Sequence, residues 1–286
     1  MARIAHSFGE REHQPPIETN MSAHQKTFDT PFSSTDARAK IDWKSFVDVI
    51  PAGLELMSPA SIMRQAFELV SNATDARRYL SALSGAQATL REACVPLLIL
   101  ERRNELPLLA TSSLTQPQRR GLGQLALQLY FAQLFRSETA LIDLWSSRFG
   151  IDQAGDVVWV PRPIYVQWDP VFSAAVRDVY AGFFSDDNEL FRSGLDRLGL
   201  GAAGAVLLRH LGEGNQRSVR FNEAGLQSTL RQIVALRGAR QPGLHRNFVA
   251  FGLYLASLHE LLASLDLAFD VRAAYLRAQP ELADGI

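Results

Sequence analysis

Residues 157–170 read VVWVPRPIYVQWDP. Two runs of β-forming residues, Val157–Val160 and Ile164–Val166, follow a turn signal at Gly155-Asp156 and are separated by two prolines. This pattern predicts a small β-hairpin. Asp169-Pro170 then supplies an N-cap residue and a proline at the first helical position, so we expect a helix to begin where the hairpin ends.

Helical periodicity dominates on both sides of this hairpin. Apolar residues recur at intervals of three and four, and Pro59 and Pro117 mark the first turns of two segments. Leu97–Leu100 is a short continuous apolar run that fits a buried strand. The sequence therefore predicts a mainly α fold, a helical domain with one small β-hairpin. The predicted helices cover about 59–73, 76–84, a stretch through Leu90 toward Cys94, 117–136, 170–183, 187–198, 203–211, 223–237 and 246–266.

The N-terminal residues differ in composition from the rest of the chain. Residues 1–40 are rich in Ser, Thr, Gln and Glu, contain Pro15-Pro16 and lack a sustained apolar period. This composition predicts a disordered or loosely held tail. Residues 41–286 are expected to form a single helical domain. Both Met1 and Met21 are compatible with the start of translation.

The composition excludes several classes of function. The formal net charge is −1 and no basic cluster is interleaved with aromatic residues, so nucleic acid is not an expected partner. No signal-peptide pattern and no run of about 18 apolar residues is found, so we expect a soluble, cytoplasmic protein without a transmembrane segment. The single cysteine, Cys94, cannot close an intramolecular disulfide, and we expect it to be buried and inert.

Two glycine-containing segments are candidate ligand loops. Gly199–Gly204 has the spacing of a dinucleotide-binding loop, but a predicted helix precedes it where that motif needs a strand. A glycine-rich helix end or close helix packing is the better interpretation. The polar loop with His210, Glu213, Asn215 and Gln216 is an alternative ligand loop, although a plain connection between two helices fits the same residues.

Three histidines outside the tail, His210, His245 and His259, are candidate ligands for haem or iron. The only Glu-x-x-His spacing, Glu10 to His13, lies in the tail, so the paired motif of a di-iron helical bundle is missing. His259 lies on the flank of an apolar helix face, where structural histidines are more common. The main interpretation therefore includes no metal or cofactor, and haem or iron belongs to the alternative.

The order of the predicted elements from Pro96 onward follows that of a known kinase-like lobe. Leu97–Glu101 followed by Glu105–Leu108 is similar to a hinge strand and its sequel. The helix 117–136 comes next. Residues 138–170 then align without a gap with a catalytic loop, a strand pair and a metal-binding loop.

On these residues, the segment 95–275 resembles the C-terminal lobe of the AarF/UbiB family of atypical kinases, protein-kinase-like proteins linked to ubiquinone biosynthesis. The resemblance implies that Asp143 stands at the position of the catalytic aspartate and Glu101 at the hinge. It also implies that Arg148 replaces the metal-binding asparagine. Pro161-Arg162-Pro163 stands where the family has Asp-Phe-Gly.

The chemistry of phosphoryl transfer is lost in this comparison. That reaction needs a lysine on the phosphates and carboxylates that hold magnesium, and a proline side chain cannot ligate magnesium. Lys26, Lys40 and Lys44 are the only lysines, and all lie ahead of any kinase strand. The family's Lys-x-Gly-Gln signature is absent. The resemblance therefore implies no catalytic residue, and we do not expect an enzyme.

Two classes of function remain after these exclusions. The first is a pseudokinase-like binding or accessory protein that holds a partner protein, a nucleotide or an isoprenoid-like, lipid-like small molecule. Its former catalytic cleft would be lined by Asp143, Arg148, Arg162 and Glu101, where a guanidinium can neutralise phosphate charge in place of a metal.

The alternative is a helical haem- or iron-dependent oxygenase-like enzyme that uses His210, His245 or His259. A helical interaction module unrelated to kinases is a third interpretation. A homodimer is compatible with each, because a helix face buried in a core and one buried at an interface have the same pattern.

Overall fold

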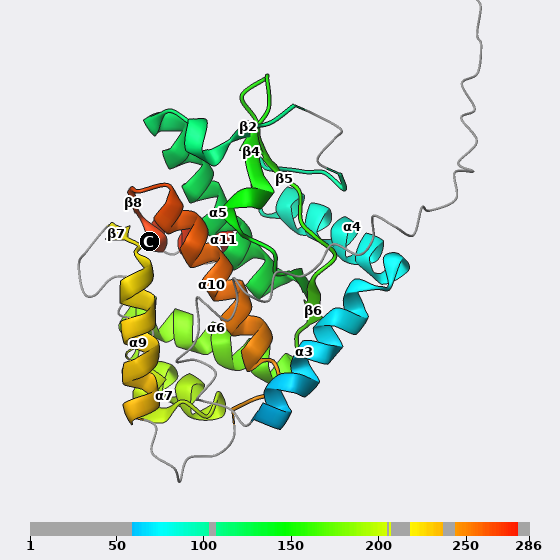
Figure 1. Ribbon diagram of the computed structural model, residues 1–286. Helices are drawn as coiled ribbons and strands as arrows, with labels where there is room; N and C mark the ends of the chain where they lie inside the picture. Colours follow the sequence, from blue (N-terminus) through cyan, green and yellow to red (C-terminus); the bar gives the residue numbers. More distant parts are fainter. Residues whose placement is uncertain (1–58, 103–106, 205, 207–217, 237–243, 280–286) are drawn as a thin grey trace, which may run out of the picture. The chain divides into compact units, whose positions relative to one another are not determined.

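Helices account for most of the described structure (Figure 1). The computed structural model describes residues 59–102, 107–204, 206, 218–236 and 244–279. The prediction of a mainly α fold is confirmed. The helices are α3 (Pro59–Ala73), α4 (Ala76–Glu92), α5 (Gln116–Arg136), α6 (Pro170–Ser185), α7 (Asn188–Arg197), α9 (Glu223–Leu236), α10 (Phe248–Ser264) and α11 (Val271–Ala278), with 3-10 turns at Thr111–Ser113, Ser146–Arg148 and Gly201–Ala203.

Three sets of predictions lie outside the described residues. They are the tail over residues 1–40, most of the helix predicted over 203–211, and the polar loop with His210, Glu213, Asn215 and Gln216. Within the described residues, the Gly199–Gly204 segment follows the helix α7 and contains a 3-10 turn. No strand precedes this segment directly, so it lacks the context of a dinucleotide-binding loop.

Polar side chains cap the N-termini of several helices at the positions where the sequence predicts that these helices start. Asp169 begins α6 by accepting a hydrogen bond from the backbone N–H of Val171, and Asp187 begins α7 in the same manner. At the start of α5, the side chain of Gln118 accepts a hydrogen bond from the backbone N–H of Thr115. The first backbone N–H groups of a helix have no partner within the helix, and these side chains accept hydrogen bonds from backbone N–H groups at the helix start.

Two helix predictions need correction. The helices predicted over 76–84 and through Leu90 are one continuous helix, α4. Gly85 lies in its middle, exposed, and costs helix stability without ending it. The apolar face of α4 continues across this glycine from Leu83 to Leu90. Separately, α11 is a short helix that the periodicity did not predict, and Asp270 caps it through the backbone N–H of Ala273.

The β-structure is larger than one hairpin. A four-stranded sheet has the order β1-β5-β4-β2, with β1 (Leu98–Ile99), β2 (Leu109–Ala110), β4 (Phe149–Ile151) and β5 (Val157–Trp159). β1 pairs in parallel with β5, so the strand predicted at Leu97–Leu100 is confirmed. Two further pairs are β3 (Thr139–Leu141) with β6 (Tyr165–Gln167) and β7 (Val219–Arg220) with β8 (Ala268–Phe269).

The prediction that the runs Val157–Val160 and Ile164–Val166 pair with each other as a hairpin is wrong. β5 pairs with β4 through the turn at Asp152–Asp156, in which Gly155 has a φ of +94° that favours glycine. The second predicted strand, β6, instead pairs antiparallel with β3. Pro161 and Pro163 lack an N–H for a ladder, so the chain leaves the first sheet between the two runs and enters a second pair.

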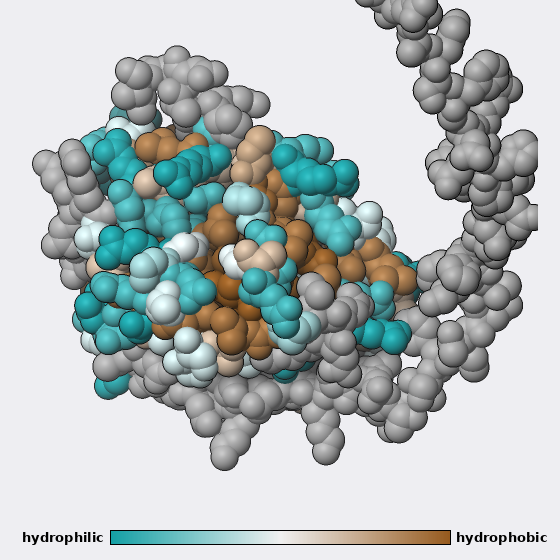
Figure 2. Space-filling model, turned by 90° about the horizontal axis from the view of Figure 1, so that it is seen from above, coloured by the Kyte–Doolittle hydropathy of each residue, from teal (hydrophilic) through white to brown (hydrophobic). Residues whose placement is uncertain are grey.

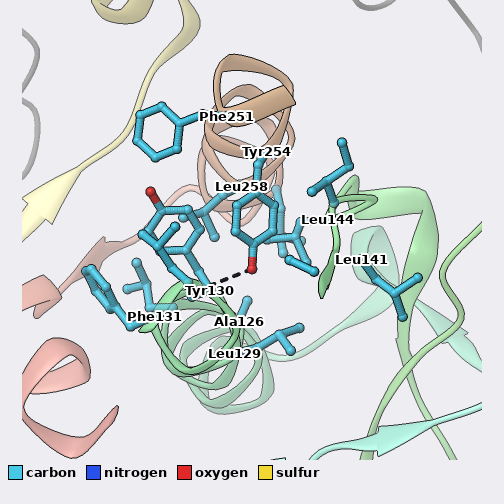
Figure 3. Packing of buried hydrophobic residues seen from close by; sticks show 14 of the residues in the cluster. Ala126, Leu129, Tyr130, Phe131, Leu141, Leu144, Phe251, Tyr254 and Leu258 are labelled. Atoms are coloured by element: carbon cyan, nitrogen blue, oxygen red, sulfur yellow. Dashed lines mark hydrogen bonds between the residues drawn. The ribbon is translucent and has the colours of Figure 1, made fainter. Parts of the chain in front are cut away.

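The core lies between α5 and α10. Tyr130 of α5 and Tyr254 of α10 have ring centroids 4.8 Å apart, and the hydroxyl of Tyr254 donates to the main-chain oxygen of Tyr130 at 3.3 Å (Figure 3). The hydroxyls of Tyr130 and Tyr180 lie 2.8 Å apart. Buried polar groups are costly unless they are hydrogen-bonded, so these contacts allow three tyrosines to fill the interior.

One face of the molecule is apolar at its centre. Seen from above, hydrophobic residues form a central area framed by hydrophilic ones (Figure 2). α4, β2, β4 and β5 lie in the upper half of Figure 1. Three leucines on α4, β1 and β2 are exposed, namely Leu80, Leu98 and Leu109. Among the described residues, no helix is both long and apolar enough to cross a membrane.

Candidate functional site

The candidate site is built on the segment that follows β3. Gln133 of α5 binds the main chain of Leu141 on both sides, donating to its oxygen at 3.2 Å and accepting from its nitrogen at 2.9 Å. Ser257 of α10 donates to the oxygen of Ile142 at 3.1 Å and accepts from the nitrogen of Leu144 at 3.3 Å. Two core helices therefore hold the backbone on either side of residue 143.

Two further contacts extend this support. The indole N–H of Trp159 in β5 donates to the main-chain oxygen of Asp143 at 2.9 Å. Glu260 of α10 accepts hydrogen bonds from the backbone nitrogen and the hydroxyl of Ser146, at 2.8 and 2.7 Å. The loop from Leu141 to Ser146 is therefore fixed by α5, α10 and β5, which is the rigid support that a functional side chain needs.

Asp143 is the centre of a buried ion cluster. Its side chain is fully buried. Arg162 donates to Oδ2 from its backbone nitrogen at 2.8 Å and from Nε at 3.0 Å, and to Oδ1 from Nη2 at 2.8 Å. Nε of Arg148 lies 3.4 Å from Oδ2. Both carboxylate oxygens are thus bound by a guanidinium in a bidentate arrangement.

This geometry limits what Asp143 can do chemically. A general base must offer an oxygen to the proton it removes, whereas both oxygens of Asp143 accept hydrogen bonds from Arg162. Two guanidinium charges beside one carboxylate also repel a divalent cation, which prefers several anionic oxygen ligands. The cluster therefore suits neither proton abstraction nor magnesium binding, and it suits an anion better.

Tyr79 of α4 lies beside the cluster. Its hydroxyl donates to the main-chain oxygen of Pro161 at 3.0 Å, next to Arg162. Burial raises the pKa of Tyr79 strongly, and the negative charges of Glu101 and Asp143 raise it further. The phenol therefore stays protonated and acts as a hydrogen-bond donor.

The structure brings three of the four predicted cleft residues together. Asp143, Arg148 and Arg162 are in direct contact. Glu101 is exposed and is linked to them only through its electrostatic effect on Tyr79. The other predicted ligand loop, with His210, Glu213, Asn215 and Gln216, lies outside the described residues.

The two described histidine candidates lie far apart. His259 is buried in α10 and packs edge-on against Phe221, with ring centroids 5.3 Å apart. His245 lies three residues before α10, and the part of α10 from Phe248 to His259 spans about 16 Å at the usual rise per residue. The two cannot bind one metal ion together. His210 lies outside the described residues.

His245 belongs to a separate polar contact with α6. Its Nε2 lies 3.8 Å from Oδ1 of Asp169, and its Nδ1 accepts a hydrogen bond from the backbone N–H of Asn247 at 3.2 Å. Arg246 donates to Oδ2 of Asp169 at 2.8 Å. The pKa of His245 is lowered, and burial is the largest cause. The negative charge of Asp169 raises this pKa, and the positive charge of Arg246 lowers it further.

The expectation for Cys94 is wrong. The residue is exposed and has a φ of +52°, because it ends the turn that follows α4 and leads into β1. Left-handed conformations occur where a helix terminates. The apolar residues around Cys94 in the sequence led to the expectation of burial, but the turn directs its side chain to the surface.

Sequence reasoning missed the residues that support the loop. Gln133 binds its backbone from the preceding helix α5, and Ser257 and Glu260 bind it from α10, more than a hundred residues later. Tyr79 of α4 instead binds the main-chain oxygen of Pro161, next to Arg162. The one available signal is a polar residue on an apolar helix face. Gln133 and Ser257 are such residues, and both are completely buried.

No protein-family model and no curated protein matches this chain. The solved structures that match include the complex of Rv3197 with erythromycin from Mycobacterium tuberculosis, with 18% identity and a TM-score of 0.45. That alignment covers 61% of this chain and 46% of the other, so this chain spans less than half the length of the structure it matches.

Proposed function

We propose that the protein is a non-catalytic, pseudokinase-like binding or accessory protein of the AarF/UbiB type. The order of elements supports the proposal. A hinge-like strand β1 precedes the long helix α5, and β3, the Asp143 loop, the β4–β5 hairpin and β6 follow in turn. This order matches the one that the resemblance over residues 95–275 implies.

The observation that carries the proposal is the bidentate ion pair between Arg162 and Asp143. Asp143 stands where the resemblance puts a catalytic aspartate, and Arg162 stands within the segment that replaces Asp-Phe-Gly. Their contacts occupy both oxygens of the carboxylate. A residue that would serve in proton transfer is therefore used as the counter-ion of an arginine.

A role in binding protein partners is supported by the apolar face of Figure 2. Exposed apolar areas with polar rims are typical of protein interaction sites. Three leucines are exposed on α4, β1 and β2, namely Leu80, Leu98 and Leu109. β1 pairs with β5, whose Trp159 donates to the main-chain oxygen of Asp143. Among the described residues, no group of three or more His, Cys, Asp or Glu side chains is placed to hold a metal ion, so none of them favours the haem- or iron-dependent alternative.

The proposal predicts that the protein carries out no phosphoryl transfer in which Asp143 takes part. The purified full-length chain is incubated with ATP and magnesium, and both ATP hydrolysis and self-phosphorylation are measured. We expect no turnover above that of Asp143→Asn, because Asp143 is not free to act as a base. Circular dichroism checks that the variant is folded, and Asp143→Glu serves as a second variant. Turnover that is lost in both folded variants would overturn the proposal.

A further inference from the structure

Arg162 is fixed in orientation by the carboxylate of Asp143. A guanidinium has five N–H groups, and the bond from Nε and the bond from Nη2 are directed at Asp143. In the part of the chain that is described, Nη1 of Arg162 makes no hydrogen bond and is not a buried atom. Nη1 is therefore the donor of Arg162 that the cluster leaves available to a ligand.

Arg148 adds a second guanidinium at the same place. Its side chain is 28% exposed, compared with 12% for Arg162, and its Nε lies beside Oδ2 of Asp143. Two planar cations with a common counter-ion are held close to each other. Guanidinium pairs of this kind match the oxygens of phosphate groups, and orientation before binding reduces the entropy lost on binding.

We propose that the cluster of Asp143, Arg148 and Arg162 binds the phosphate or diphosphate group of the protein's ligand without a divalent cation. This inference rests on the proposed function. Arg162 and Arg148 donate to the phosphate oxygens. Asp143 is a positioning residue that orients Arg162. The arrangement replaces the lysine and magnesium of phosphoryl transfer with two arginines, so it binds an anion and leaves it unreacted.

The experiment measures binding of inorganic pyrophosphate and of ADP to the full-length chain by calorimetry in EDTA, and again with excess magnesium. We expect at least one of the two ligands to bind in EDTA. Magnesium should leave the affinity unchanged or weaken it, because it reduces the negative charge that the arginines recognise. ADP that binds more tightly than pyrophosphate indicates a nucleotide as the source of the phosphate, and equal affinities indicate a free polyphosphate.

Arg148→Gln is the variant that tests the site, since Arg148 is partly exposed and the variant is expected to fold. Loss of one charge-assisted pair should weaken binding about tenfold or more. Arg220→Gln is the matched control, because this exposed arginine lies on β7, in a different sheet, and forms its ion pair with Asp266. The control should bind like the wild type.

Three outcomes would overturn this inference. They are no binding of either ligand, binding that requires magnesium, and equal affinities of Arg148→Gln and the wild type. The proposed function fails separately, through turnover that depends on Asp143. A chain without turnover and without anion binding would keep the proposed function and lose only the phosphate site.

Discussion

At the scale of single residues, the buried contact between Asp143 and Arg162 is the most sensitive point of the molecule. Arg162→Ala would leave a fully buried carboxylate with Arg148 as its remaining cation. Removing one partner of a buried ion pair costs about 3 kcal/mol or more. We expect urea denaturation to show a loss of this size in the free energy of unfolding.

A double variant separates the pair from its surroundings. Asp143→Leu combined with Arg162→Met should lose less stability than the sum of the two single variants, because no buried charge is left without its main partner. If the losses in the free energy of unfolding of the two single variants add up to that of the double variant, the two side chains do not stabilise each other. Arg220→Ala, at the surface, should change the free energy by less than about 0.5 kcal/mol.

The packing of α6 against α7 shows how glycines set the distance between elements. A Cβ at Gly194 would lie 2.8 Å from the main-chain oxygen of Ala175, and a Cβ at Gly182 would lie 2.5 Å from the nitrogen of Phe191. These are backbone atoms, which cannot move aside without separating the helices. Both glycines are therefore required by close contact and not by a left-handed backbone.

This packing gives a prediction at the scale of the element. Gly194→Ala should destabilise the protein by about 1 to 3 kcal/mol, because it forces overpacking between two helices. Gly85→Ala is the matched control, since a Cβ there meets nothing within 4 Å and the residue lies inside the exposed face of α4. This second change should stabilise by about 0.5 to 1 kcal/mol. Thermal unfolding of both variants checks the opposite signs, and two shifts of the same sign would contradict the packing described.

The helices could largely be predicted from the sequence because their starting signals are local. Asp169, Asp187 and Pro117 act within one turn of their own position. The positions of β1, β5 and β6 could also be predicted, but the pairing of these strands could not. The partner of β6 is β3, more than twenty residues earlier, and β1 pairs with a strand about sixty residues later. Pairing over such separations depends on tertiary structure, which local propensity does not encode.

The candidate site shows the same division. Asp143, Arg148 and Arg162 could be named from the sequence through the resemblance. Their mutual contacts, and the support from Gln133 and Ser257, depend on how α5 and α10 approach the loop. Periodicity places Gln133 on a buried face, but it does not say which backbone groups that side chain binds.

For the whole molecule, the contact between α6 and the start of α10 makes stability depend on pH. The folded state lowers the pKa of His245, mainly through burial, from an unfolded value of about 6.5. The unfolded chain therefore binds more protons between these two values. Stability from this residue is complete above about pH 6.5 and is lost as the pH falls through the lower folded pKa.

The measurement compares urea midpoints between pH 7.5 and 5.5 for the wild type and His245→Gln. The wild type should lose stability toward the acidic end, because protonation also removes the hydrogen bond that Nδ1 accepts from Asn247. The variant should show a smaller slope. Equal slopes would mean that His245 does not contribute to the pH dependence.

The turn between α4 and β1 has one practical consequence. Cys94 is the only thiol of the chain, and it is exposed four residues before a strand of the four-stranded sheet. A maleimide fluorophore would therefore attach at one position without any engineered cysteine. Its emission would report on the surroundings of β1, so the binding of a candidate ligand near this strand could be followed in real time with the native sequence.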